Sequence, residues 1–177
     1  MIRISGGKYR SRKLETPETT LTKPTMDKVR AGIFNALGND LSNKKVLDLF
    51  AGSGSYGFES LSRNATYVTF VDQTIYSRKA VEQNAKNLGI NEYEFIQSDV
   101  LSFLKNCDKT YDVISLDPPY KLDIVHNVLE LISSKHLLNA NGIIVVESEK
   151  ELTFPNETCR EIRSYHYSLA HVYLLKY

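Results

Sequence analysis

Short apolar runs alternate along most of the chain with segments whose apolar residues recur at helical spacing. The runs predicted as buried strands cover 45–50, 67–71, 93–97, 111–116 and 142–147. Between them, the spacing predicts helices that run through about 63, over 75–88, through about 104 and over 123–133. Strands alternating with helices predict right-handed crossovers and an open α/β fold, with a mostly parallel sheet covered by helices on both faces.

The two ends of the chain depart from this alternation. Apolar positions from 26 to 37 predict a helix with Thr25 as its N-cap and Gly38 as its stop. Before it, a basic segment that is interleaved with Tyr9 and opened by Gly6-Gly7 predicts a β-hairpin. At the other end, 160–165 and 169–175 predict a closing antiparallel pair of strands. We therefore expect an N-terminal extension over 1–40 and a main domain over 41–177.

Composition narrows the class of protein. A length of 177 residues, with 42% hydrophobic and 24% charged residues, suits a globular protein and argues against disorder, collagen or a coiled coil. No apolar run approaches the roughly 20 residues of a membrane span, and the N-terminus lacks a signal-peptide core. Cys107 and Cys159 match neither a metal-ligand spacing nor a disulfide framework. We expect a cytoplasmic protein without a metal.

The net charge of +1 conceals an asymmetry. Residues 1–30 hold eight basic and three acidic side chains, a net charge of +5, whereas the remaining 147 residues hold 14 basic and 18 acidic ones, a net charge of −4. Taken alone, the basic cluster fits a solvated strand or tail as well as a binding surface. Its interleaving with Tyr9 favours RNA, because basic side chains meet phosphates while an aromatic ring stacks on a base.

Acidic residues end four of the predicted strands. In open α/β sheets, ligands bind beyond the carboxyl ends of the strands. One carboxylate there is commonplace as a helix cap or a turn residue, but four like charges on one rim repel each other unless a ligand pairs with them. The four residues are Asp48, Asp72, Asp99 and Asp117.

The turn after the first of these strands has the pattern GxGxxG over 52–57 and opens a helix, which is the context of a nucleotide-binding turn. Asp72 follows Gly52 by 20 residues, where a carboxylate can accept both hydroxyls of a ribose. These features fit NAD as well as another adenosine cofactor. Asp48 favours S-adenosylmethionine, because a carboxylate opposes a pyrophosphate but suits an ammonium and a sulfonium. Asp99 can accept from the adenine amine, cap the next helix, or do both.

The tetrapeptide Asp117-Pro118-Pro119-Tyr120 is the most specific motif. Two successive prolines hold the chain extended and fix the Asp117 carboxylate and the Pro118 carbonyl side by side. Two fixed acceptors suit the two N–H donors of an exocyclic base amine, and Tyr120 can stack on the base. The alternative is a rigid strand-to-helix turn in which Tyr120 only packs.

These motifs resemble a known family. The segment DLFAGSG over 48–54 and the DPPY tetrapeptide resemble class I S-adenosylmethionine-dependent methyltransferases that act on an exocyclic amino nitrogen. The segments GGKYRSRKL over 6–14 and KPTMDKVR over 23–30, with Phe34-Asn35, narrow the resemblance to the bacterial 16S ribosomal RNA guanine-N2 methyltransferase family. The resemblance implies a seven-stranded class I fold, S-adenosylmethionine as the cofactor, and a guanine of 16S rRNA, in a small ribosomal subunit or an assembly intermediate, as the acceptor. We expect a monomer.

The predicted site falls into three groups of residues. The catalytic residues are Asp117, Pro118 and Tyr120. The cofactor-binding residues are Asp48, Phe50, Gly52, Ser53, Gly54, Gly57, Asp72, Gln73, Asp99, Val100 and Asp117. The RNA-binding residues are Lys8, Tyr9, Arg10, Arg12, Lys13, Lys23 and Arg30. The chain departs from the family's usual residues at Ser11, where glycine is more frequent, at Tyr56, where a small or aliphatic residue is usual, and at His166, where Tyr-Gly is the commoner pattern.

Three other functions stay open at this point. A DNA adenine-N6 methyltransferase shares the DPPY motif, but 177 residues hold no obvious separate target-recognition domain. An NAD-dependent dehydrogenase shares the glycine turn and leaves Asp48 and the DPPY motif unexplained. A non-catalytic ribosome-assembly factor on the same fold leaves the intact acceptor tetrapeptide without a role.

Overall fold

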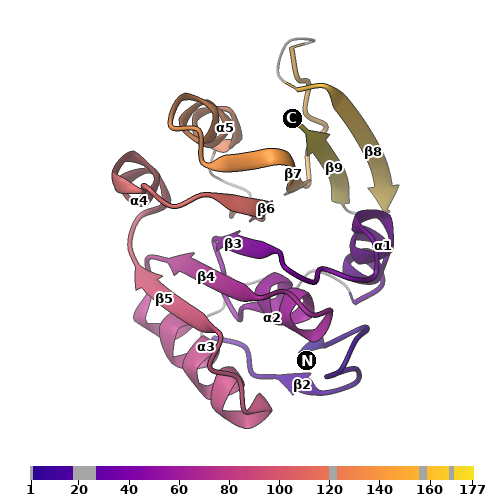
Figure 1. The fold of residues 1–177 in the computed structure, drawn as a ribbon, viewed down its shortest axis with the longest axis vertical. Coiled ribbons are helices and arrows are strands. Elements are labelled where there is room, and N and C mark those ends of the chain that lie inside the picture. The colour runs from indigo at the N-terminus through magenta and orange to yellow at the C-terminus, as the bar shows by residue number, and fades with distance from the viewer. Residues whose placement is uncertain (1, 18–26, 120–122, 156–158, 168–169) are drawn as a thin grey trace.

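A seven-stranded sheet runs through the centre of the molecule in the computed structural model (Figure 1), which describes residues 2–17, 27–119, 123–155, 159–167 and 170–177. The strand order is β5-β4-β3-β6-β7-β9-β8, in which β5 to β7 are parallel and β9 is antiparallel to both of its neighbours. The strands are β3 (Lys45–Leu49), β4 (Tyr67–Asp72), β5 (Tyr93–Gln97), β6 (Tyr111–Leu116), β7 (Leu138–Ser148), β8 (Glu161–Tyr167) and β9 (Ala170–Lys176). The predicted α/β fold with a closing antiparallel pair is confirmed.

Helices cover both faces of this sheet because successive strand residues point to opposite sides. Val46 of β3 belongs to the core under α1, α2 and α3, whereas its neighbour Leu47 belongs to the core under α4 and α5. Figure 1 shows the same two groups on either side of the strands. The helices are α1 (Asp27–Leu37), α2 (Ser55–Ser62), α3 (Ile75–Leu88), α4 (Val100–Asn106) and α5 (Val125–Ser134). No described helix combines the length and the apolar character needed to cross a membrane.

The helix ends follow from single residues. Thr74 accepts a hydrogen bond from the Ser77 amide and begins α3, and Gly89 ends it with a φ of 68°. Asn64 takes the left-handed conformation just after α2, and Gly38 takes it just after α1. The bounds of α3, β5 and β6 are those predicted. The predicted cap Thr25 lies outside the described residues.

Strand β7 differs from the prediction, because it begins at Leu138 instead of 142. A register shift between Tyr111 and Val113 lets Tyr111 pair with Leu138 before the regular parallel ladder begins. The predicted helix over 123–133 begins two residues later, at Val125.

The first residues form the expected hairpin, although its two strands are short. Strand β1 (Ile2–Arg3) pairs antiparallel with β2 (Lys13–Leu14). Its side chains Ile2 and Leu14 are buried in the same core as Val46. The division into segments 1–40 and 41–177 therefore stays a prediction about function, since the two segments share one core.

We predict that Phe70→Ala lowers the free energy of unfolding by about 3–5 kcal/mol. Phe70 is fully buried on β4, and its ring centroid lies 5.1 Å from that of Phe58 and 5.9 Å from that of Tyr93. Urea unfolding followed by circular dichroism measures the change. Tyr76→Ala is the matched control, because that ring is 49% exposed. Equal losses in the two variants would contradict this description of the core.

Candidate functional site

The acidic strand ends meet at one edge of the sheet. In the register, Leu49 lies opposite Val71 on one side and Leu116 on the other. Phe50, Asp72 and Asp117 are the next residues along the chain, so all three follow the paired positions at the same edge of the sheet. The sheet thus brings the glycine turn to the same edge as Asp72, which is predicted to bind a ribose, and Asp117, which is predicted to bind the amine.

The glycine turn is built from left-handed backbone. Phe50, Gly52 and Gly54 have φ angles of 60°, 53° and 77°, and Gly54 is the N-cap of α2. The Gly52 amide donates to Asp72 Oδ2 at 3.0 Å, and the Thr74 amide donates to Asp72 Oδ1 at 2.9 Å. Two backbone N–H groups therefore fix the Asp72 carboxylate against the turn.

The third glycine allows α2 to lie directly on the sheet. A Cβ atom on Gly57 would come within 2.1 Å of Phe70 Cε1 and 2.8 Å of Val68 Cγ1, so a larger residue does not fit. The close approach lets the Gly57 amide donate to Asp48 Oδ2 at 2.9 Å. The sequence identified this glycine from its spacing, and the contact supplies its physical reason.

Asp48 lies beneath the turn and is 2% exposed. Its other oxygen accepts from the Ser115 hydroxyl at 2.9 Å, so the carboxyl group joins β3, β6 and α2. Burial raises the pKa of Asp48 to about 7, and the bonds from Ser115 and Gly57 only partly oppose that rise. A cation beside the turn favours the ionised form of this group. Its contact with a cofactor stays a prediction.

Asn84 is a site residue that the sequence reasoning missed. It is fully buried on α3, and its Nδ2 donates to the Ser53 carbonyl and to the Glu15 carbonyl, each at 3.0 Å. Its Oδ1 accepts from the Glu15 amide at 2.7 Å. One amide side chain therefore joins the glycine turn to the segment that leaves the hairpin. Its spacing from Val81 and Leu88, which places it on the apolar side of the predicted helix, is the sequence signal that could have identified it.

Tyr56 contacts a second residue that the sequence reasoning missed, Glu147 of β7. Its hydroxyl donates to Glu147 Oε2 at 2.6 Å, and both side chains are buried. Burial raises the pKa of Tyr56 well above its ordinary value, and the charges of Glu147 and Asp117 add to the rise. Because Leu116 pairs with Val146, Asp117 and Glu147 follow neighbouring positions of β6 and β7. Glu147 ends a predicted strand, so the reasoning that selected the four aspartates applies to it as well.

The remaining predicted site residues are placed less tightly. Asp99 is the N-cap of α4 and accepts from the Ser102 amide at 2.9 Å, which confirms its capping role, while its role toward adenine stays a prediction. Gln73 is exposed and Val100 is buried. Asp117 is half-buried and Pro118 is buried. Tyr120 lies outside the described residues.

Most of the predicted RNA-binding side chains lie on the hairpin loop between β1 and β2. Lys8, Arg10 and Lys13 are exposed, and Tyr9 is half-buried with the Lys8 ammonium 5.1 Å from its ring centroid. Arg12 is exposed, and its Nη2 donates to the Asn87 carbonyl at 2.7 Å in the last turn of α3. Lys23 lies outside the described residues.

The prediction that Arg30 binds RNA is wrong for the folded chain, because its side chain is completely buried. Its Nε lies 3.4 Å from Glu59 Oε2, and its Nη2 donates to Asp27 Oδ1 at 2.9 Å and to the Arg3 carbonyl. Arg30 therefore belongs to an internal ion-pair cluster and does not face solvent.

Besides Tyr56, the chain departs from the family pattern at Ser11 and His166. Ser11 has a φ of 67°, a conformation that glycine adopts at lower cost, which accounts for the glycine usual there. The His166 ring packs against the His171 ring in a tilted arrangement, with centroids 4.5 Å apart and an angle of 33° between the planes. Within the described part of the chain, no three His, Cys, Asp or Glu side chains form a group able to hold a metal ion.

Comparison with known proteins gives consistent matches. The family model described as conserved hypothetical protein 95 matches residues 2–176. The ribosomal RNA small subunit methyltransferase D of Escherichia coli K12 is 32% identical over 154 residues, which cover 87% of this chain and 78% of that protein. The structure titled putative methyltransferase yhhF from Escherichia coli superposes with a TM-score of 0.87 at 30% identity, covering 99% of this chain and 97% of the other.

A more distant structure shares the fold. It is the Thermus thermophilus 16S rRNA N2 G1207 methyltransferase in complex with AdoMet and guanosine. The TM-score is 0.74 at 18% identity, and the match covers 90% of this chain and 44% of the other. At that identity the likeness shows a common architecture.

We predict that Asp48→Asn changes how stability depends on pH. Because the folded-state pKa of about 7 lies above the ordinary value of 3.8, native Asp48 keeps its proton where unfolded Asp48 has lost it. The wild type is therefore expected to lose stability relative to Asp48→Asn, by about 1 kcal/mol per pH unit between about pH 4.5 and 7, and then to level off. Urea unfolding across this range measures it. A pH-independent difference would mean that native Asp48 is ionised throughout.

Proposed function

The chain belongs to the family described as conserved hypothetical protein 95, and on that premise we propose that it transfers a methyl group from S-adenosylmethionine to the exocyclic N2 amine of a guanine in 16S ribosomal RNA. The observation that carries the proposal is the register of β4, β3 and β6, in which Leu49 pairs with both Val71 and Leu116. Asp72, the glycine turn and Asp117 therefore follow at one edge of the sheet. A cofactor held by Asp72 and an amine held by Asp117 therefore lie at the same edge of the sheet, on either side of β3.

The residues on the cofactor side fit S-adenosylmethionine. Asp72 presents a carboxylate fixed by two backbone amides, suited to the two hydroxyls of a ribose. The left-handed turn from Phe50 to Gly54 keeps the backbone clear of side chains at Gly52 and Gly54. Beneath it, the ionised form of Asp48 suits an ammonium. When bound, the cofactor supplies an electrophilic methyl group.

On the acceptor side, Asp117 and Pro118 bind the amine. The two N–H groups of the amine donate hydrogen bonds to the Asp117 carboxylate and the Pro118 carbonyl. These two hydrogen bonds turn the nitrogen toward a tetrahedral shape and direct its lone pair at the methyl group. The nitrogen becomes more acidic as it is methylated, so Asp117 or water accepts the proton late, and no strong base is required beforehand. Rotation of the guanine out of its stack costs a few kcal/mol, and stacking on Tyr120 offsets about 1–3 kcal/mol of it.

The hairpin loop supplies the contacts to the RNA backbone. Lys8 and Arg10 on this loop and Lys13 at the start of β2 are exposed, and they reach phosphates near the guanine. The substrate is 16S rRNA within a small ribosomal subunit or an assembly intermediate, and the protein acts on it in the cytoplasm as a monomer. The name of the E. coli relative supports rRNA over DNA or a dinucleotide substrate. The intact DPPY motif supports catalysis over a purely structural role in assembly.

We expect Asp117→Ala to reduce methyl transfer at least about 100-fold while the Kd for S-adenosylmethionine changes less than about threefold. The variant removes one acceptor of the amine and leaves Asp72 and the glycine turn in place. Transfer of labelled methyl to small ribosomal subunits, naked rRNA and DNA is measured in parallel. Asp108→Ala is the matched control, since that carboxylate is 94% exposed. A fully active Asp117→Ala enzyme, or label in DNA alone, would refute the proposal.

Reversal of charge at Arg10 and Lys13 is expected to weaken rRNA binding and to lower the slope of log K against log salt by about one for each phosphate that the loop no longer neutralises. Arg12 is left unchanged because it is bonded to α3. The control is the same reversal at Lys105 of α4 and Lys135 beside α5, on the opposite face of the sheet. Filter binding over a range of salt concentrations gives the slopes. Equal slopes for the two double variants would remove the hairpin loop from the RNA interface.

A further inference from the structure

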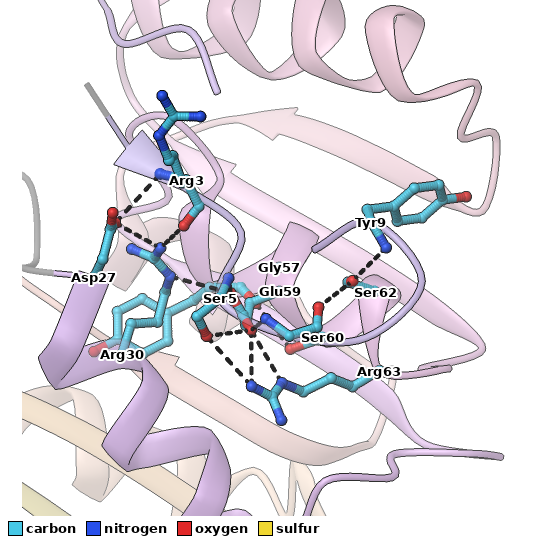
Figure 2. Close-up of polar contacts among 12 residues, drawn as sticks. Arg3, Ser5, Tyr9, Asp27, Arg30, Gly57, Glu59, Ser60, Ser62 and Arg63 are labelled. Atoms are coloured by element: carbon cyan, nitrogen blue, oxygen red, sulfur yellow. Dashed lines mark hydrogen bonds and ion pairs between the residues drawn. The ribbon is translucent and has the colours of Figure 1, made fainter. Parts of the chain in front are cut away.

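The hairpin loop is attached to α2 through its own backbone (Figure 2). The Ser5 amide donates to Glu59 Oε2 at 2.7 Å, and the Gly6 amide donates to Glu59 Oε1 at 2.9 Å. The Ser5 hydroxyl also donates to Oε1, at 2.7 Å. One carboxylate in the middle of α2 therefore binds three donors of the loop.

Glu59 is completely buried and is balanced by two arginines. Arg63 Nε donates to Glu59 Oε1 at 3.0 Å, and Arg30 Nε lies 3.4 Å from Oε2 on the other side. Through Arg30, the cluster also reaches Asp27 of α1 and the Arg3 carbonyl of β1. A buried ion pair is weak evidence for stability, because removing its charges from water costs about as much as their attraction returns. Its clear effect here is geometric, since it fixes β1, α1 and α2 relative to one another.

Ser62 provides the second attachment, one turn further along α2. Its hydroxyl accepts from the Tyr9 amide at 2.9 Å and donates to the Gly6 carbonyl at 2.5 Å. Its carbonyl accepts from the Lys8 amide at 2.8 Å. Gly7, with a φ of 75°, lies against it so closely that a Cβ atom would come within 1.9 Å of the Ser62 carbonyl oxygen.

These bonds orient the loop. The amides of Ser5, Gly6, Lys8 and Tyr9 all donate to α2, which leaves the Lys8 and Arg10 side chains exposed. In Figure 2 the Tyr9 ring likewise points away from the Glu59 cluster. Helix α2 also begins at the glycine turn, so one element of eight residues, about 12 Å long, holds the turn at one end and the loop at the other.

We propose that Glu59 and Ser62 are positioning residues for RNA binding, which hold loop residues 5–12 at a fixed place relative to the glycine turn. The basic side chains then meet phosphates at a set distance from the guanine that enters the site. This inference rests on the proposed function and specifies how its RNA contact is placed. Neither residue is among those proposed to bind the cofactor or the reacting amine.

The first test compares Ser62→Ala with Ser60→Ala in the full-length protein. Both hydroxyls are buried on α2, but that of Ser60 donates only within the helix, to the Tyr56 carbonyl. With small ribosomal subunits as the varied substrate, Ser62→Ala is expected to raise KM for the subunits about fivefold. We expect kcat and KM for S-adenosylmethionine to stay within about twofold of the wild type. Equal subunit KM values for the two variants overturn the proposal.

The second test examines the attachment without RNA or cofactor. Trypsin cleaves after Lys8, Arg10, Arg12 and Lys13 only when the loop leaves α2, so Glu59→Gln is expected to speed cleavage there at least about tenfold. Glu82→Gln is the control, because it removes the same charge from an exposed pair with Arg78. If Glu59→Gln does not fold, digestion of Ser62→Ala decides.

The two tests separate the inference from the proposed function. Faster cleavage in Ser62→Ala together with a raised KM for the subunits supports the positioning role. Faster cleavage with an unchanged KM overturns it, because the loop is then attached for stability alone. A wild-type protein that methylates no rRNA refutes the proposed function, whereas the digestion result still reports whether Glu59 and Ser62 hold the loop.

Discussion

The close approach of α2 to the sheet is the constraint on which the site depends. All eight residues of this helix are buried, and Gly57 lies against Phe70 with no room for a side chain. At this separation the Gly57 amide reaches Asp48, and the Tyr56 hydroxyl reaches Glu147 at the acceptor edge. Further along, the same helix presents Glu59 to the hairpin. A helix displaced outward by one methyl group would break these contacts together, because they radiate from one short rigid segment.

Two buried carboxyl groups, Asp48 beneath α2 and Glu59 on it, are stabilised in different ways. Asp48 has only a backbone amide and a hydroxyl as partners, so burial dominates and its pKa rises to about 7. Glu59 has two guanidinium groups and three donors from the hairpin loop. The first arrangement leaves a group whose charge responds to a cation nearby. The second surrounds a carboxylate with donors from separate segments of the chain and so joins those segments.

The sequence predicted the parts of this arrangement that depend on local chemistry. The predicted bounds of α3 agree with the structure, in which Gly89 ends the helix as its position in the sequence indicates and Thr74 caps its start. The role of Arg30 was not predictable in this way, because its partner Glu59 lies 29 residues further along the chain. Its spacing from Ile33 and Phe34 places it on the buried side of α1, and that was the one local sign of its burial. A count of charged residues treats every arginine as exposed, so it does not reveal that Arg30 is buried and paired with Glu59.

Attachment through the main chain has a consequence for how the protein changes over evolutionary time. Apart from the Ser5 hydroxyl and the Arg12 guanidinium, the bonds that attach the loop to α2 and α3 come from main-chain groups of the loop. A side chain is opposed sterically at Gly6 and Gly7. The residues at positions 8, 10 and 13 can therefore be substituted without detaching the loop from α2. The position of this surface is therefore set by α2, whereas its chemistry is set by the exposed side chains. Point substitutions at those positions can change its chemistry and leave the glycine turn unaltered.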